Sequence, residues 1–134
     1  MPSGGGAAVR VVNSSKDELR AEGRTIVIVS YDLATRRASE LEAARFGMVV
    51  ADESHCLKSA DSNRSKALLP LVRKAKRALL LSGTPLPSRP AEIFTQANAL
   101  RPKCFAKRKD FEVRYCAAYK DRFGTPARVE LVIS

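Results

Sequence analysis

Two adjacent carboxylates, Asp52 and Glu53, form the part of the sequence that is best suited to chemistry. They follow the apolar run 48–51 and precede Ser54 and His55. One carboxylate of such a pair can hold a metal ion while its neighbour orients a water molecule, and this combination suits attack on a phosphate. Taken alone, these residues fit equally well the solvated end of a strand followed by a serine that caps a helix.

Polar residues also end two other apolar runs. Because the run 48–51 is short and rich in valine, it is typical of a strand buried on both faces. Open parallel sheets bind ligands beyond the carboxyl ends of their strands, where polar residues of several strands meet at one edge. One site can therefore combine three strand ends, which read Ser30-Tyr31-Asp32, Asp52-Glu53-Ser54-His55 and Ser82-Gly83-Thr84-Pro85.

The elements that would position these ends alternate between strand and helix. Apolar runs predict strands at 9–12, 25–30, 48–52 and 78–81, and a further strand-like run lies at 129–133. Helical patterns fall between them, at about 16–22, 35–46, from 61, 90–101 and 109–120. This order predicts an α/β fold with βαβ units, a parallel sheet and helices on both faces, which makes three layers.

Two helices carry more specific expectations. Pro70 lies inside the helix that begins near residue 61, and it predicts a kink or two short helices. In the helix 90–101, Ile93, Ala97 and Leu100 share one face and are expected to point toward the core. Asp32 or Thr35 is expected to cap the helix that ends near residue 46.

Length and composition indicate one folded domain. The chain has 134 residues, of which 45% are hydrophobic and 28% charged. No apolar run approaches the ~18 residues of a membrane span, so no membrane partner is expected. Cys56, Cys104 and Cys116 stand far apart and only one histidine is present, which argues against a zinc site and favours a reducing compartment.

The net charge of +10 favours a polyanionic partner such as DNA, RNA or an acidic protein. Basic groups at 73–77 and 103–109 could contact phosphates without reading sequence. The simpler interpretation is that such groups form a solvated, basic surface.

Together, the three strand ends resemble the first RecA-like lobe of superfamily-two helicases and translocases, a P-loop NTPase-type fold. The Swi/Snf branch is the most similar, and within it the annealing-helicase (HARP-like) translocases. The resemblance runs from about residue 9 to 119. It rests on Val29-Ser30-Tyr31-Asp32-Leu33, Asp52-Glu53-Ser54-His55-Cys56-Leu57-Lys58, Ala75-Lys76-Arg77, Leu79-Leu80-Leu81-Ser82-Gly83-Thr84-Pro85, Ser88-Arg89-Pro90-Ala91-Glu92 and Arg114-Tyr115-Cys116.

The resemblance implies ATP and Mg²⁺ as cofactors. It implies that Asp52 helps to hold Mg²⁺ on the nucleotide and that Glu53 orients or deprotonates the attacking water. His55 would link the nucleotide to the loop Ser82-Gly83-Thr84, which couples hydrolysis to movement on DNA. For His55 the alternative is an ordinary histidine at the start of a helix.

The resemblance also implies contact with DNA, without sequence specificity, at Ser30 and Tyr31. The alternative is a capped helix start with Tyr31 packed in the core. Relatives of this kind move on double-stranded DNA or rewind it, so a nuclear protein of chromatin and of DNA repair at the replication fork is expected.

The sequence departs from the family pattern in its phosphate loop. No G-x-x-x-x-G-K-[ST] motif is present, and no second lobe with an arginine finger. We therefore expect a flexible leader at 1–8, an incomplete lobe at 9–124 and a divergent tail at 125–134. The strand 78–81 would then be an exposed apolar edge, and one role for the run 129–133 is to cover it.

Three functions follow for a chain of this kind. It could be a fragment of a working translocase that does not hydrolyse ATP by itself. It could be a catalytically inactive DNA-binding module. It could also be a regulatory fragment that docks on the remainder of a translocase.

Overall fold

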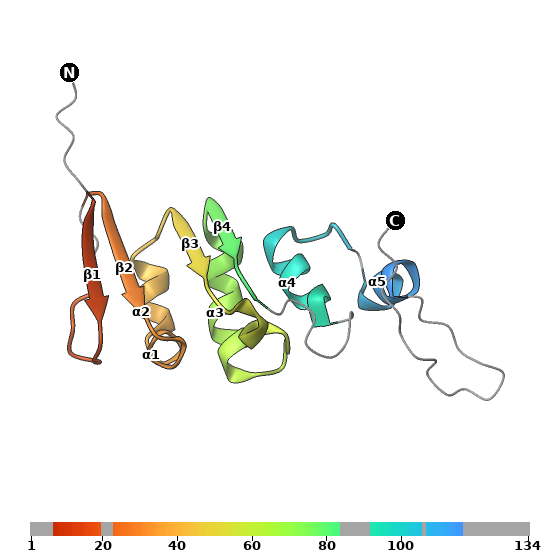
Figure 1. Ribbon diagram of the computed structural model, residues 1–134, viewed down its shortest axis with the longest axis horizontal. Coiled ribbons are helices and arrows are strands. Elements are labelled where there is room, and N and C mark those ends of the chain that lie inside the picture. The colour runs from red at the N-terminus through yellow and green to blue at the C-terminus, as the bar shows by residue number, and fades with distance from the viewer. Residues whose placement is uncertain (1–6, 20–22, 84–91, 106, 117–134) are drawn as a thin grey trace, which may run out of the picture.

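The computed structural model describes residues 7–19, 23–83, 92–105 and 107–116. Strands and helices alternate along this part of the chain, as the sequence predicted (Figure 1). The elements are β1 (Ala8–Val12), β2 (Thr25–Val29), α1 (Tyr31–Arg36), α2 (Ala38–Ala43), β3 (Met48–Ala51), the 3₁₀ helix η1 (Ser54–Leu57), α3 (Asn63–Lys74), β4 (Arg77–Leu80), α4 (Ile93–Leu100) and α5 (Arg108–Tyr115).

The four strands are parallel, but they form two pairs. In one pair β1 lies beside β2, with Ala8 opposite Thr25. In the other β3 lies beside β4, with Met48 opposite Arg77. All four strands run in the same direction in Figure 1. The predicted α/β class with parallel strands is confirmed, whereas the single continuous sheet is replaced by two two-stranded sheets in the described part of the chain.

Helices α1, α2 and α3 cover one face of both sheets. Side chains that alternate along the strands point toward these helices, and they close a core with buried leucines. The opposite face of the strands is exposed, so the described residues provide two of the three predicted layers. The core residues are Val12, Leu19, Leu33, Ala34, Leu41, Ala51, Leu57, Leu68, Leu69, Val72 and Ala99.

The predicted helix 35–46 is observed as two short helices that begin earlier. Ser30 caps α1, since its hydroxyl accepts a hydrogen bond from the Leu33 N–H at 3.3 Å. The expected caps, Asp32 and Thr35, lie inside α1 instead. Arg37 separates α1 from α2 with φ −110°, because its side chain is drawn into a polar network.

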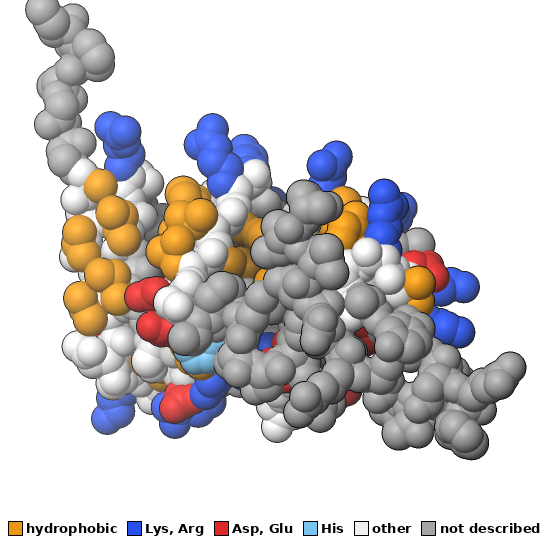
Figure 2. All heavy atoms as spheres, turned by 45° about the vertical axis from the view of Figure 1, so that its right-hand side comes forward, with side chains coloured by type: hydrophobic (Ala, Val, Ile, Leu, Met, Phe, Trp, Pro, Cys, Tyr) orange, Lys and Arg blue, Asp and Glu red, His pale blue; other side chains and the backbone are white. Residues whose placement is uncertain are grey.

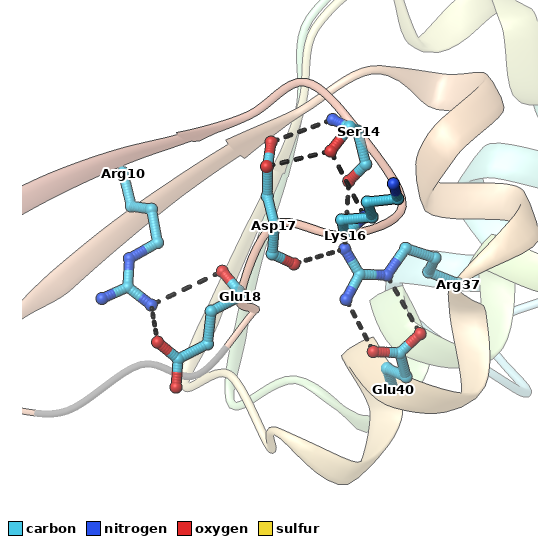
Figure 3. A network of polar contacts seen from close by, with 7 residues as sticks. All are labelled: Arg10, Ser14, Lys16, Asp17, Glu18, Arg37 and Glu40. Atoms are coloured by element: carbon cyan, nitrogen blue, oxygen red, sulfur yellow. Dashed lines mark hydrogen bonds and ion pairs between the residues drawn. The ribbon is translucent and has the colours of Figure 1, made fainter.

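That network ties the chain after β1 to α2 (Figure 3). The Arg37 guanidinium, only 9% exposed, donates to the carbonyls of Ser14 at 3.3 Å and Asp17 at 2.7 Å, and to both carboxylate oxygens of Glu40. Asp17 accepts from the N–H groups of Asn13 and Ser14, and these bonds lower its pKa. The predicted helix at 16–22 is absent over residues 16–19, where the chain makes a turn; 20–22 lie outside the described residues.

Of the two outcomes predicted at Pro70, a kink or two short helices, the second is wrong. Helix α3 is continuous over 12 residues with Pro70 inside it. Proline removes the N–H that would bond to the Lys66 carbonyl, but burial of Leu68, Leu69 and Val72 on either side holds the helix together.

Helix α4 buries a different face from the one predicted. Thr95, Gln96 and Ala99 are buried, while Leu100 is 48% exposed. The helix contacts α3 and η1 with Ala99 in the apolar core and Gln96 bonded to Ser54, so its apolar stripe was a poor guide to its orientation. Helix α5 adds an aromatic cluster, in which Phe111 contacts Phe94, Phe105 and Tyr115.

Some expectations fall outside the described residues. These are the start of the helix at 90, the last residues of the helix 109–120, the leader 1–6 and the run 129–133. Among the residues that the structure describes, no helix is both long and apolar enough to cross a membrane.

Candidate functional site

The three polar strand ends lie in contact. Tyr31, the first residue of α1 after β2, donates its hydroxyl to the carbonyl of Asp52 at 2.7 Å. His55 lies with Nδ1 3.2 Å from the Ser82 hydroxyl, which follows β4. The parallel strands thus bring β2, β3 and β4 to one edge, as the positions of the polar residues suggested.

The two carboxylates point toward different groups. Asp52 is exposed, and its Oδ1 accepts from the Glu53 N–H at 2.9 Å. Glu53 adopts a left-handed backbone with φ 48° and ψ 45°, which is strained for a residue with a side chain. This turn carries the Glu53 carboxylate to within 3.1 Å of His55 Nδ1. Strain of this kind is often found at functional sites.

A buried serine, Ser54, anchors η1, and no sequence pattern indicated its partner. Ser54 is 1% exposed. Its N–H donates to the Leu81 carbonyl at 2.7 Å, and its hydroxyl donates to Gln96 Oε1 at 3.0 Å. These bonds fix η1 against β4 and α4. The only signal for Gln96 would have been a polar residue on the inner face of α4, and the apolar stripe of that helix pointed elsewhere.

A second long-range pair joins two of the motifs. Lys58, which follows the carboxylate segment, lies with Nζ 3.4 Å from Glu92 Oε2 at the start of α4. Both residues belong to quoted motifs, but the sequence did not indicate that they pair.

Tyr31 links α1 to the end of β3 and is also a candidate contact for DNA. Burial raises the pKa of its hydroxyl to about 12, with nearby Cys56 and Asp52 adding to the effect. The Arg64 guanidinium lies over the ring, 5.4 Å from its centroid, and also pairs with Asp32 at 2.8 Å. The Ser30 hydroxyl caps α1, and Tyr31 packs partly buried against the core, as the structural alternative for this strand end expected. Contact of Ser30 and Tyr31 with DNA stays a prediction.

The loop after β4 is described only in part. Ser82 and Gly83 are described, Gly83 as exposed, and Thr84 lies outside the described residues. No cluster of three or more potential metal ligands occurs among the described histidine, cysteine and acidic residues. A nucleotide-bound Mg²⁺ needs only one or two carboxylates, because phosphates and waters complete its shell. The exposed Asp52 carboxylate fits that requirement.

Comparison with known proteins identifies the family. Residues 7–126 match the model of the SNF2-related domain. Over 124 residues the chain is 42% identical to the SWI/SNF-related matrix-associated actin-dependent regulator of chromatin subfamily A-like protein 1 of Xenopus laevis, covering 92% of this chain and 13% of that protein. It is 40% identical over 120 residues to the human DNA annealing helicase and endonuclease ZRANB3, covering 87% of this chain and 11% of that protein.

A more distant relative gives the same result. The Drosophila melanogaster protein of the first name is 36% identical over 119 residues, which are 89% of this chain and 15% of that protein. The chain therefore spans a small part of the length of the curated relatives that it matches. Their length, the matched domain and the parallel α/β architecture agree: the chain belongs to the SNF2-related domain family and forms an incomplete RecA-like lobe.

Proposed function

We propose that this chain forms the metal-and-water side of the ATPase site of a DNA translocase of the annealing-helicase kind. The observation that carries the proposal is the divergence of two adjacent carboxylates at the end of β3. Asp52 is exposed beyond the strand, and Glu53 is turned toward His55 at 3.1 Å. Asp52 takes part in binding Mg²⁺ on ATP, and Glu53 orients the attacking water. Bound Mg²⁺ supplies charge neutralisation of the phosphates.

His55 then couples the site to the loop after β4. Its Nδ1 is shared between the Glu53 carboxylate and the Ser82 hydroxyl, at 3.1 and 3.2 Å. A change in the position of Ser82-Gly83-Thr84 would alter the hydrogen bonds of His55 and so the position of Glu53. This path supports a role in linking hydrolysis to DNA.

DNA is the proposed partner, without sequence specificity. The strand end with Ser30 and Tyr31 lies beside Asp52, so a contact there would also reach the ATPase site. The names of the relatives, a regulator of chromatin and a DNA annealing helicase, support DNA as the partner and chromatin as the setting. We extend the proposal to a nuclear protein that acts in DNA repair at the replication fork.

A segment exchange tests the ATPase proposal. The matching 124 residues of the Xenopus laevis relative are replaced by those of this chain, and ATP hydrolysis is measured with and without DNA. We expect DNA-stimulated hydrolysis in the hybrid. Glu53→Gln should lower it by about 100-fold or more while ATP binding persists, because only the water-activating group is lost. Glu112→Gln, far along the chain in α5, is the matched control.

The coupling role has a separate signature in the same hybrid. His55→Ala and Ser82→Ala should each remove the stimulation by DNA but leave basal hydrolysis, and the double variant should be no worse than either alone. Loss of basal hydrolysis in His55→Ala, with stimulation intact, would contradict the coupling path.

The phosphate cradle must come from outside this sequence. Since the motif is absent from the 134 residues, the isolated chain should not turn over ATP. Steady turnover by the pure chain that Glu53→Gln abolishes would overturn this part of the proposal.

A catalytically inactive DNA-binding module is the second candidate. The net charge of +10 favours it, because that charge acts on DNA without nucleotide. A hybrid with no ATPase activity, combined with DNA binding by the isolated chain, would support this candidate over the first.

A further inference from the structure

Two backbone hydrogen bonds of Leu81 enclose the carboxylate pair. The Leu81 N–H donates to the Ala51 carbonyl at 2.9 Å, and the Leu81 carbonyl accepts from the Ser54 N–H at 2.7 Å. Asp52 and Glu53 lie between these two bonds, so they leave the line of β3 as an excursion of two residues. The direction of this excursion depends on how the residues on either side of it are held.

The residue that follows the excursion is held from inside the protein. Asp52 and Glu53 are exposed, whereas Ser54 is buried. In Figure 2 the single histidine of the chain, which follows Ser54, is visible at the surface near acidic side chains. The Ser54 hydroxyl donates to Oε1 of Gln96, which is also buried, at 3.0 Å. Helix α4 therefore fixes the side chain of Ser54, while the neighbouring residues face solvent.

The backbone of Glu53 needs such an attachment. Its φ of 48° and ψ of 45° lie in the left-handed region, which is strained for a residue with a side chain. A conformation of this kind persists only where the surrounding structure over-determines it. Leu81 fixes the backbone of Ser54 and Gln96 fixes its side chain, so residue 54 is held at two points directly after the strained residue.

Helix α4 contacts the same segment at a second point. Lys58 Nζ lies 3.4 Å from Glu92 Oε2, about one helical turn before Gln96. The Lys58–Glu92 pair is more exposed than the pair of Ser54 and Gln96. It keeps α4 attached when the inner bond is removed. Loss of the inner bond therefore frees the side chain of Ser54 without detaching the helix.

We propose that Gln96 is a positioning residue for Glu53. It acts through Ser54: the bond holds residue 54, and the strained turn before it then directs the Glu53 carboxylate to within 3.1 Å of His55 Nδ1. The inference rests on the proposed ATPase function, in which Glu53 orients the attacking water. Because Gln96 affects that water only through Ser54 and Glu53, its loss lowers kcat and leaves the KM for ATP nearly unchanged.

Kinetics of the hybrid enzyme, in which this chain replaces the matching segment of the Xenopus laevis relative, test the proposal. Ser54→Ala and Gln96→Leu should each lower kcat for ATP hydrolysis by about tenfold or more, with the KM for ATP changed by less than about twofold. Each variant leaves one buried polar group without its partner, so each should also lower the melting temperature of the isolated chain.

The double variant separates positioning from stability. With both partners apolar, no buried polar group of the pair is left unpaired, so the melting temperature of the isolated chain should return toward the wild-type value. The kcat of the hybrid should stay as low as in the single variants, because residue 54 is still not held by α4. A kcat that recovers together with the melting temperature would show that the pair only stabilises the fold.

Ser65→Ala is the matched control. Ser65 is also a buried serine, and its hydroxyl accepts from the Ser62 hydroxyl at 2.9 Å at the start of α3. Its removal should lower the melting temperature and leave kcat unchanged, since this bond does not hold the carboxylate segment. A fall of kcat as large as that in Ser54→Ala would assign the effect to lost stability and overturn the proposal.

Amide hydrogen exchange in the isolated chain, followed by NMR, tests the positioning without ATP. Gln96→Leu should speed exchange of the Ser54 N–H by about tenfold or more, whereas the Leu81 N–H, bonded within the sheet, should change little. Unchanged exchange at Ser54 would overturn the positioning role. Absence of hydrolysis in the hybrid, or hydrolysis that Glu53→Gln does not lower, would instead contradict the proposed function, so the two failures are distinguishable.

Discussion

At the scale of single residues, Glu53 combines strain with a proposed chemical role. Its left-handed backbone, with φ 48°, directs the carboxylate to His55. A non-glycine residue in this conformation costs about 1–2 kcal/mol, which the fold must supply elsewhere. Arg45, with φ 50°, has the same backbone but no contact with the polar strand ends that the structure records. Substitutions at Arg45 therefore report the cost of the left-handed backbone alone, whereas substitutions at Glu53 also remove the proposed catalytic carboxylate.

Glycine at position 53 should stabilise the fold relative to alanine. Both Glu53→Gly and Glu53→Ala remove the contact with His55, but only glycine adopts positive φ without cost, so its free energy of unfolding should be higher by about 1 kcal/mol. Urea denaturation of the isolated chain measures the difference. Arg45→Gly and Arg45→Ala should show the same gain. In the hybrid enzyme neither Glu53 variant should hydrolyse ATP, because both lack the carboxylate. Equal free energies of unfolding for Glu53→Gly and Glu53→Ala would show that the backbone at position 53 is not strained.

Tyr31 gives a prediction for alkaline pH. Its pKa rises from 10.0 to about 12 on folding, chiefly through burial. The folded state therefore holds the hydroxyl proton more tightly, so the stabilisation is complete below pH 10 and is lost as the pH rises through about 12. Tyr31→Phe should lower the free energy of unfolding by about 1 kcal/mol at neutral pH through loss of the bond to Asp52.

The difference between wild type and Tyr31→Phe should shrink above pH 10. Denaturation curves at a series of pH values measure it. Tyr115→Phe is the control, because Tyr115 makes ring contacts with Phe105 and Phe111 in the described structure. A difference that stays constant with pH would show that Tyr31 does not titrate differently in the folded state.

At the scale of elements, Pro70 tests how far packing overrides local preference. The proline leaves the Lys66 carbonyl without its helical donor, yet α3 continues over 12 residues. Pro70→Ala should restore the bond and raise the free energy of unfolding by about 1–3 kcal/mol. Lys66→Ala, which keeps the proline and so does not restore that bond, should change the free energy of unfolding little. Thermal denaturation measures both, and a destabilised Pro70→Ala would mean that α3 depends on the ring for packing.

The sequence predicted the elements better than their arrangement. Strand positions followed from β-branched runs such as 25–29, and the meeting of three strand ends followed from the geometry of parallel sheets. The orientation of α4 did not follow, because it depends on the hydrogen bond between Ser54 and Gln96, 42 residues apart. Likewise, the separation of α1 from α2 depends on Arg37, whose acceptors lie in the chain after β1. Contacts between residues so far apart in the chain leave no local pattern in the sequence.

At the scale of the whole molecule, charge and apolar surface point to two different partners. The basic surplus of +10 suits DNA, while the bare face of the strands suits protein. The bare face arises because the described residues hold one helical layer of a fold whose strands are normally covered on both faces, whereas the charge is a property of the whole sequence. DNA binding by the isolated chain should therefore depend on charge and not on nucleotide or sequence.

The salt dependence of DNA binding distinguishes a DNA-binding module from a regulatory fragment. Fluorescence anisotropy with labelled DNA duplexes of two unrelated sequences measures the association constant. Its logarithm should fall linearly with the logarithm of the salt concentration, with a slope of about −0.9 per phosphate contacted. The slope should be the same for both duplexes. Lys107→Gln with Lys109→Gln, exposed at the start of α5, should reduce the slope if that basic group contacts phosphate. Absence of DNA affinity at low salt, together with co-purification with the longer relative, would favour the regulatory fragment, since the chain would then act through its apolar face alone.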